Sequence, residues 1–221
     1  MEDVAVRVDG VEKAFQSGGS RVEVLRGVSL ALARGESLAL TGESGSGKST
    51  LLHLIGGLDL CDAGRIEIAG QEVTGLDDAG RAALRRGTVG VVFQQFNLIP
   101  SLDVAANVAF QARLAGRRDR TWEAHLVEAL GLSDQLAKYP EALSGGQQQR
   151  VAIARTLAAR PQVVLADEPT GNIDEATADA VLDLMLALVA ETGAALLMVT
   201  HSERLARRLD RRLHLAHGRV S

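Results

Sequence analysis

The chain has 221 residues, of which 46% are hydrophobic, so it can bury one good core, and we expect one compact unit with an inserted lobe. Its formal net charge of −4 argues against a general nucleic-acid-binding surface, which would need a basic excess. No apolar run approaches the roughly 18 residues that span a bilayer, and the acidic start Met1-Glu2-Asp3 is not a signal peptide, so we expect a soluble, cytosolic chain.

The first segments of the chain alternate between apolar and polar residues. Val4–Val8 and Val28–Leu32 have the pattern of half-buried antiparallel strands, with Gly18-Gly19 as a turn between them. Phe15 lies just before that turn, and it is one of few aromatic residues in a chain with only 3% of them. These segments predict an antiparallel sheet at the edge of the domain.

A phosphate-binding loop follows the apolar run Ser37–Thr41 and leads into a helix. The stretch Gly42-Glu43-Ser44-Gly45-Ser46-Gly47-Lys48-Ser49-Thr50 matches the pattern G-x-x-x-x-G-K-[ST] completely, between a strand and a helix start. Its glycines let backbone N–H groups face a phosphate, and the helix dipole favours the same anion. Lys48 adds a charge for the β- and γ-phosphates, and the Ser49 hydroxyl is placed to bind Mg²⁺.

The predicted phosphate loop suggests a role for Phe15. An aromatic side chain at a loop edge near a nucleotide can stack on adenine, which contributes roughly 1 to 3 kcal/mol. The alternative is a phenylalanine that covers the core.

Cys61 has no second cysteine to pair with, and we interpret it as an ordinary residue.

Two more strands are predicted after the phosphate loop. Gly56-Gly57 ends the helix, and Gly64–Gly70 alternates as a strand bounded by glycines. Thr88–Phe93 has the composition of a buried strand and ends at Gln94. A glutamine in this place can reach a bound metal or its water, or it can simply be a solvated strand end.

From Ser101 the hydrophobic period changes from 2 to 3.6. We predict one helix over Leu102–Leu114 with Ser101 as its N-cap, and a second helix to Leu130 with Thr121 as its N-cap. The charged turn at 116–120 is expected to be solvated, and Trp122 is expected to pack in the helices. Residues from about 95 to 158 are interpreted as a helical lobe inserted into an α/β domain.

A second anion site is predicted at the end of this lobe. Leu143-Ser144-Gly145-Gly146-Gln147 precedes the helical Val151–Leu157, so a serine and two glycines lie at a helix N-terminus. One nucleotide needs one phosphate loop. A second loop therefore suggests two ligands, or one ligand shared between two copies of the chain.

Carboxylates follow the next apolar strand. Val163–Ala166 leads into Asp167, which can hold Mg²⁺ through a water, and Glu168, which can orient or deprotonate an attacking water. A tight turn from Pro169 follows, and Asp174 is a candidate helix N-cap and contact residue.

The C-terminal part is predicted to contain a long helix and a further buried strand. The helix runs over Glu175–Thr192 and is ended by Gly193, and the strand over Ala194–Thr200 finishes at His201. A histidine at the carboxyl end of such a strand lies at the ligand edge of the sheet, although a lone histidine is often only structural. Glu203–Arg212 carries five arginines and is interpreted as a solvated helix.

These motifs, in this order and over essentially the whole length, resemble those of ABC ATPases. The Leu-Ser-Gly-Gly-Gln run at Leu143 is close to diagnostic of that superfamily. Within it, Phe93–Pro100 and Glu168–Asn172 look like the lipoprotein-release and macrolide-export group of ATP-binding subunits, and the cell-division ABC ATPase and peptide exporters are similar here.

The resemblance implies an α/β fold of the P-loop ABC ATPase type, with an antiparallel β edge subdomain and an inserted helical subdomain. Residues 1–221 would form a single nucleotide-binding domain. Its catalytic core would be about 1–94 and 159–221, and its helical subdomain about 95–158. The implied ligands are ATP and Mg²⁺.

The resemblance also implies a role for each motif residue. Phe15 would stack on adenine. The phosphates would be cradled by the loop residues Gly42, Ser44, Gly45, Ser46, Gly47, Lys48, Ser49 and Thr50. The metal would be held by Ser49, Gln94 and Asp167. The catalytic residues would be Lys48, Gln94, Glu168 (general base) and His201.

The resemblance also implies a function for the second anion loop. Ser144, Gly145, Gly146 and Gln147 would meet the γ-phosphate held by the opposite subunit of a head-to-tail homodimer, and Asp174 would communicate across the interface. The segment around Gln94 would receive a helix of a membrane partner.

The implied function is that of an ATP-hydrolysing subunit that powers a separate membrane permease, for export or release of lipoprotein, drug or peptide. Such a chain would be cytoplasmic and peripheral on the inner face of the membrane, with no nucleic-acid partner. The alternative is a regulatory ABC ATPase that controls a non-transporting membrane partner, such as a cell-division or cell-wall complex.

Overall fold

The computed structural model describes residues 3–221, apart from the side chain of Ser17. The strands are β1 (Val4–Ser17), β2 (Ser20–Ala33), β3 (Ser37–Thr41), β4 (Ala63–Ile68), β5 (Gln71–Glu72), β6 (Val89–Val92), β7 (Val163–Asp167), β8 (Ala195–Val199), β9 (Arg211–Ala216) and β10 (Arg219–Val220). The α-helices are α1 (Lys48–Ile55), α2 (Asp78–Gly87), α3 (Val104–Leu114), α4 (Arg120–Ala129), α5 (Gly145–Ala158), α6 (Glu175–Thr192) and α7 (Glu203–Ala206). Short 3₁₀ turns lie at Ser133–Gln135 and Pro140–Ala142.

The strands form two sheets. The first is antiparallel, with the order β2-β1-β4-β5, and the second has the order β10-β9-β3-β8-β7-β6. In the second sheet all neighbours are parallel except β10, which pairs antiparallel with β9. Because β8 lies between β3 and β7, the segments that follow these three strands emerge at one edge of the sheet.

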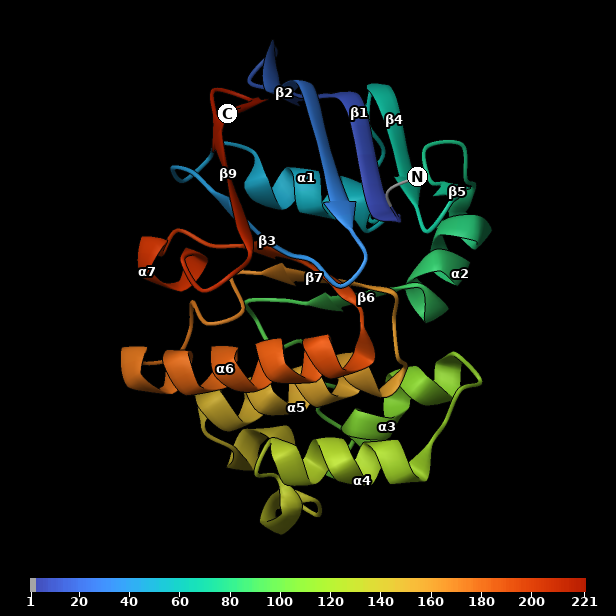
Figure 1. Cartoon of the computed structure of the whole chain (residues 1–221), viewed down its shortest axis with the longest axis vertical. Coiled ribbons are helices and arrows are strands. Elements are labelled where there is room, and N and C mark those ends of the chain that lie inside the picture. Colours follow the sequence, from blue (N-terminus) through green and yellow to red (C-terminus); the bar gives the residue numbers. More distant parts are fainter. Residues whose placement is uncertain (1–2) are drawn as a thin grey trace.

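The molecule is layered, as Figure 1 shows, with α1 between the two sheets, α2 beside them, and α3, α4, α5 and α6 on the far side of the parallel sheet. One buried cluster joins the antiparallel sheet, α1 and one face of the parallel sheet. A second cluster joins the other face of the parallel sheet to α3, α4, α5 and α6. The parallel strands are therefore covered on both faces, which explains their continuous apolar sequences. The predicted α/β fold with an antiparallel edge sheet is confirmed.

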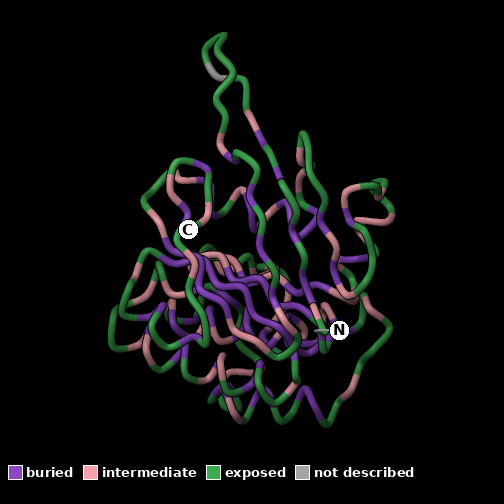
Figure 2. The backbone as a smooth tube through the Cα atoms, turned by 45° about the horizontal axis from the view of Figure 1, so that its top comes forward, coloured by how far each residue is buried: buried purple, intermediate pink, exposed green. Residues whose placement is uncertain are grey.

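The hairpin of β1 and β2 is longer than predicted, because each strand has 14 residues. Its tip projects from the body of the molecule and is exposed, as Figure 2 shows. The sequence analysis also did not anticipate α2, whose first turn is capped by the Asp77 side chain.

Both predicted N-caps in the helical lobe are wrong by two residues. Asp103, not Ser101, caps α3 by accepting a hydrogen bond from the Ala106 N–H at 2.7 Å. Asp119, not Thr121, caps α4 by accepting from the backbone N–H groups of residues 121 and 122. An aspartate is at least as good an N-cap as serine or threonine, and in each helix it lies next to the first residue with helical dihedrals.

The charged turn at 116–120 is not merely solvated, because Asp119 caps α4 and Arg117 donates to the Gly87 carbonyl at 2.8 Å. Trp122 packs as predicted, with 5% of its surface exposed and its indole N–H on the Leu157 carbonyl at 2.9 Å. The predicted helix over Glu203–Arg212 is wrong, since the helix ends at Ala206 and Arg211 already lies in β9. Pairing with β3 overrides the helical pattern there.

Within residues 3–221, no helix is both long and apolar enough to cross a membrane.

Candidate nucleotide-binding and catalytic site

The phosphate loop connects the buried strand β3 to α1 and is shaped by its glycines. Gly42, Gly45 and Gly47 have positive φ values of 146°, 78° and 102°. A Cβ at Gly42 would lie 2.2 Å from the Leu215 carbonyl oxygen, so only glycine fits there. The loop is therefore held in one backbone conformation, with its N–H groups available to an anion at the N-terminus of α1.

Lys48 and Ser46 fit a bound phosphate. The Lys48 ammonium donates to the carbonyl oxygens of Gly42 at 2.8 Å and Glu43 at 2.7 Å, which leaves the third of its N–H groups for a ligand. The Ser46 hydroxyl is buried and has no hydrogen-bond partner among residues 3–221. Because a buried hydroxyl without a partner is costly, a phosphate oxygen beside it would satisfy a donor that the protein leaves open.

Ser49 and Asp167 come together although 118 residues separate them. The Ser49 hydroxyl donates to Asp167 Oδ1 at 2.9 Å, and His53 Nε2 lies 3.6 Å from Asp167 Oδ2. Burial raises the pKa of Asp167 above its ordinary value, and the hydrogen bond from Ser49 acts in the opposite direction. A cation at this pair would favour the charged carboxylate.

The donors available here suit Mg²⁺ rather than an ion held by protein alone. Residues 3–221 contain no cluster of three or more His, Cys, Asp or Glu side chains that could hold a metal. Mg²⁺ is usually bound by one or two protein oxygens together with waters and substrate phosphates. The Ser49 and Asp167 oxygens beside the phosphate loop fit that arrangement.

Glu168 and His201 form the second pair at this edge. His201 Nδ1 lies 3.2 Å from Glu168 Oε2, and the two residues follow the adjacent strands β7 and β8. Glu168 has a left-handed φ of 45°, which is uncommon for a residue with a side chain. Its backbone is held there because its N–H donates to the Val199 carbonyl and its own carbonyl accepts from Gly171. Such strain is typical of functional positions.

Gln94 contacts the turn that follows Glu168. Its main-chain carbonyl accepts from Asn172 Nδ2 at 3.0 Å, and its side-chain Nε2 lies 3.5 Å from Asn172 Oδ1. A Cβ at Gly171 would lie 2.7 Å from Gln94 Nε2, so a larger residue there would displace the end of the Gln94 side chain. From the sequence, Asn172 was predicted only as part of the turn, and no role was predicted for it.

The second anion loop has the local structure that the sequence indicated. Ser144 caps α5 by accepting from the Gln147 N–H at 3.3 Å, and the Gln147 side chain accepts from the Ser144 N–H at 2.9 Å. A Cβ on Gly146 would lie 2.5 Å from Thr177, so α5 packs closely against α6. Among residues 3–221, no hydrogen bond or ion pair joins 144–147 to the phosphate loop.

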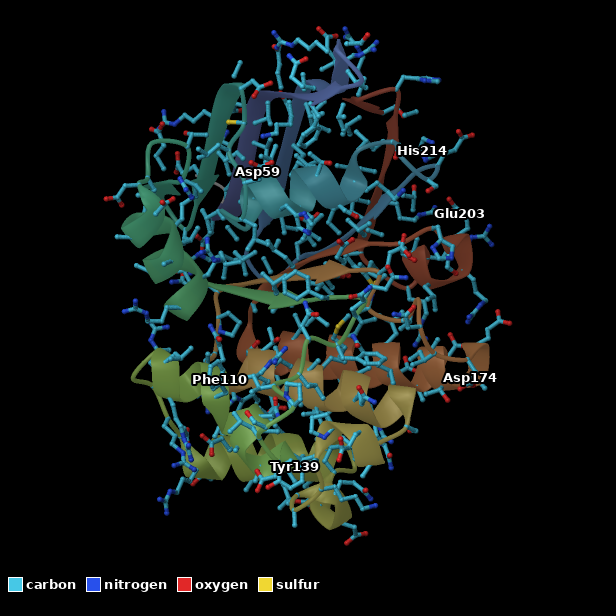
Figure 3. All side chains as sticks on the ribbon, turned by 180° about the vertical axis from the view of Figure 1, so that it is seen from behind. Asp59, Phe110, Tyr139, Asp174, Glu203 and His214 are labelled. Carbon is cyan, nitrogen blue, oxygen red and sulfur yellow. The ribbon has the colours of Figure 1, made fainter. Side chains whose placement is uncertain are left out.

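The remaining predicted site residues lie on the hairpin and at the start of α6. The ring of Phe15 is 43% exposed, and the Lys13 ammonium lies 5.0 Å from its centroid. Asp174 caps α6 through the Thr177 N–H at 3.0 Å, and the hydrogen bonds from Thr177 lower its pKa. Figure 3 shows Asp174 at the same side of the molecule as Glu203, at the start of α7.

The sequence is similar to known proteins along nearly its whole length. The family model described as "ABC transporter" matches residues 25–171. The chain is 47% identical over 99% of its length to the lipoprotein-releasing system ATP-binding protein LolD of Ruegeria sp., covering 98% of that protein. It is 49% identical to LolD of Novosphingobium aromaticivorans, with 99% of both chains covered. It is 46% identical to the uncharacterized ABC transporter ATP-binding protein YbbA of Escherichia coli, with 97% and 96% covered.

A solved structure gives the same result at the level of the fold. The chain superposes with a TM-score of 0.89 and 37% sequence identity on the ATP-binding cassette MJ0796, in a dimeric post-hydrolysis state bound to ADP and Pi. The match covers 98% of this chain and 96% of that one.

Proposed function

The chain belongs to the ABC transporter family, and from this premise we propose that it binds and hydrolyses ATP to power a separate membrane permease. The observation that carries the proposal is the presence of two side-chain pairs near the phosphate loop. Ser49 pairs with Asp167, and Glu168 pairs with His201, all at the carboxyl edge of the parallel sheet. Such an edge is where open α/β sheets bind their ligands.

In the proposed reaction, the loop N–H groups and Lys48 bind the phosphates and neutralise part of their charge. Mg²⁺, when bound, stabilises the charge that develops on the phosphoryl oxygens. Glu168 orients the attacking water and accepts its proton. His201 keeps the Glu168 carboxylate in place, and His201 also contacts the γ-phosphate. Gln94 contributes its side-chain carbonyl to the metal and the water.

We infer that two copies of the chain work head to tail. The Ser144 loop has the geometry of an anion site but lacks contact with the phosphate loop of its own chain. A second copy would bring its phosphate loop to this serine, which explains why one domain carries two anion-binding loops. ATP would then hold the dimer closed, and hydrolysis would open it.

The proposed permease would dock near the segment that follows β6. A cavity of about 340 Å³ lies there, and its lining includes Phe93, Asn97, Phe110 and Arg155; Figure 3 labels Phe110 on α3. Since the relatives named above include lipoprotein-releasing ATP-binding proteins, we propose lipoprotein, drug or peptide release as the task. The chain would then be a cytoplasmic protein attached to the membrane through its permease.

The proposal is tested with Glu168→Gln. This variant should bind ATP normally, lose turnover, and accumulate a dimer in the presence of ATP and Mg²⁺, because the general base is absent while every phosphate contact remains. Binding is measured with a fluorescent nucleotide and dimer formation by analytical ultracentrifugation. Equal turnover of the variant and the wild type would contradict the role of Glu168.

The transport assignment has its own test. The tagged Glu168→Gln chain is recovered from native membranes in mild detergent with ATP and Mg²⁺, and the proteins that accompany it are identified by mass spectrometry. We expect an integral membrane permease with a large extracytoplasmic domain. Recovery of soluble partners alone, or of cell-wall hydrolase regulators, would contradict the transport assignment and leave the nucleotide chemistry intact.

A further inference from the structure

An alternating row of charges joins α6 to α7. Glu175, Asp179 and Asp183 are spaced by four residues and therefore lie on one stripe of α6. Arg204 lies in α7, and Arg208 comes four residues after Arg204, just beyond the end of that helix. We call these five residues the charge ladder. The three acids alone would repel one another along α6, and the two arginines alternate with them.

The ladder is continuous. Arg204 Nε lies 3.1 Å from Glu175 Oε1, and Arg204 Nη1 contacts the Asp179 carboxylate. Arg208 Nη1 lies 3.4 Å from the same Asp179 carboxylate, and Arg208 Nη2 contacts Asp183. Each arginine thus bridges two acids with different nitrogen atoms, which uses the fork geometry of the guanidinium group.

The two helices joined by the ladder begin next to the proposed catalytic residues. α7 begins two residues after His201, and α6 begins after the turn that starts at Glu168. In Figure 1 the start of α6 and α7 lie on the same side of the molecule. The ladder therefore ties together the two chain segments whose side chains meet at the 3.2 Å contact of Glu168 and His201.

A cavity lies between these two segments. Its volume is about 230 Å³, and its lining includes Glu168, His201, Glu175 and Arg204. Because van der Waals packing is incomplete across a cavity, the two walls can shift relative to each other unless another interaction holds them. Glu175 and Arg204, which form one contact of the ladder, both line this cavity.

We propose that Arg204 and Arg208 are positioning residues that hold His201 in register with Glu168. This inference rests on the proposed function, since it assumes that these two residues perform the hydrolysis. A single exposed ion pair contributes little, but a network in which each arginine bridges two carboxylates restricts the relative movement of two elements more strongly. The arginines do not touch the phosphate loop, so nucleotide binding should not depend on them.

The alternative is that the apolar side of α7 is sufficient. Leu205, Ala206 and Leu209 are buried in the core cluster that includes α6. If these contacts alone fix the position of His201, then removal of the ladder charges will not change catalysis. The two possibilities differ in the turnover number and not in whether the chain folds.

The test compares Arg204→Gln/Arg208→Gln with the wild type. We expect kcat for ATP to fall about ten-fold, with KM nearly unchanged, since sub-ångström misplacement of a catalytic group is costly. We also expect faster hydrogen exchange of the backbone at residues 200–206. Arg207→Gln is the matched control, because it removes one positive charge from the same segment and the Arg207 side chain has no ion pair among residues 3–221.

A variant with the ladder charges reversed tests whether catalysis depends on the contacts between the helices or on the sign of each charge. Asp179→Arg/Asp183→Arg, combined with Arg204→Glu/Arg208→Glu and Glu175→Gln, should recover most of the lost turnover, because it restores alternating contacts with opposite signs. An unchanged kcat and unchanged exchange in the double glutamine variant would overturn the inference. The loss of turnover in the Glu168→Gln variant tests the proposed function separately. The hydrogen-exchange measurement tests the ladder independently of ATP turnover.

Discussion

Asn172 determines how Gln94 presents its side chain. Asn172 Nδ2 donates to the Gln94 main-chain carbonyl at 3.0 Å, which turns Asn172 Oδ1 toward the Gln94 side chain. Gln94 Nε2 lies 3.5 Å from that oxygen, so the Gln94 side-chain oxygen remains free. Glutamine binds a metal through its side-chain oxygen, and the same oxygen can accept a hydrogen bond from an attacking water. Asn172 thus links the turn after Glu168 to the proposed metal-sensing residue.

Asn172→Ala should therefore impair catalysis without unfolding the protein. The Gln94 amide would be free to present its NH₂ group, and we expect kcat to fall by about ten-fold while the Mg²⁺ concentration for half-maximal activity rises. ATPase assays over a Mg²⁺ titration measure both effects. Gln95→Ala is the control, since that side chain is exposed next to Gln94; an effect of equal size in the control would contradict the role of Asn172.

Asp210 is a residue whose charge contributes to stability. Its Oδ2 accepts from the Ser37 hydroxyl at 2.6 Å and from the Ser37 N–H at 2.9 Å, which ties the start of β9 to β3. These hydrogen bonds, first from the side chain and then from the backbone of Ser37, lower the pKa of Asp210. The stabilisation is present above the ordinary pKa of 3.8 and is lost as the pH falls through the lower folded value.

Asp210→Asn should consequently lower Tm at neutral pH, because it removes the charge that these hydrogen bonds favour. The difference in Tm from the wild type should shrink as the pH falls below 3.8, and it should be smallest below the lower folded pKa of Asp210, where the wild-type carboxyl is protonated in both the folded and the unfolded state. Thermal unfolding by circular dichroism at several pH values measures this. A Tm difference that stays constant over the whole range would show that the charge has no part in it.

At the scale of elements, one buried side chain forms hydrogen bonds with the segment that leads into α3. Asn107 has no exposed surface, and its Oδ1 accepts from the Ile99 N–H at 2.9 Å. Its Nδ2 donates to the carbonyls of Ile99 at 3.1 Å, Leu102 at 2.8 Å and Asp103 at 3.1 Å. The segment between β6 and α3 has no regular secondary structure, so Asn107 supplies the partners that a helix or sheet would provide.

Asn107→Leu should destabilise the protein by about 3 kcal/mol, because it leaves several buried backbone groups without partners while keeping the volume similar. Urea unfolding gives the change in the free energy of unfolding. The segment at 99–103 should also exchange its amide hydrogens faster. A loss below about 0.5 kcal/mol, the usual range of surface substitutions, would mean that water replaces Asn107 at no cost.

The helical lobe shows which features of an element depend on local sequence. The hydrophobic period located α3 and α4, and it placed their C-terminal ends within one residue of the observed ones. The N-caps were misplaced because the sequence offers two capping residues near each start, Ser101 and Asp103, or Asp119 and Thr121. The choice depends on where the chain enters the helix, which is set by contacts such as those of Asn107.

At the scale of the whole molecule, the two anion-binding loops should act on one ligand only in a dimer. Ser144→Arg places bulk and charge at the start of α5, so we expect the variant to bind ATP with unchanged affinity as a monomer and to lose hydrolysis. Nucleotide titration and ATPase assays measure these quantities. Ser144→Ala is the matched comparison, because it removes the cap of α5 at a cost of about 1 kcal/mol but leaves the interface open.

If Ser144→Arg hydrolyses ATP at the wild-type rate, then the loop at Ser144 does not take part in catalysis and the shared-site interpretation is wrong. The assay is run with the Glu168→Gln chain as the dimer reference. Ultracentrifugation of Glu168→Gln/Ser144→Arg with ATP should then show a monomer.

The sequence by itself determined the local chemistry of this protein. The phosphate loop, the helix cap at Ser144, the strands that end at Asp167 and at His201, and the α/β fold class follow from residue spacing within short segments, because glycine dihedrals, helix caps and strand periodicity are local properties of the chain. The resemblance to ABC ATPases rests on these same local motifs.

Only the tertiary structure decided which of these motifs meet. Ser49 reaches Asp167, Glu168 reaches His201, and Gln94 reaches Asn172 across 118, 33 and 78 residues. These contacts depend on β8 lying between β3 and β7 and on the packing of α6 against α5. The charge ladder was likewise not predicted from the sequence, since the arginines at 203–212 were expected to be solvated. Strand order and helix packing arise from burial over the whole chain, and no short segment specifies them.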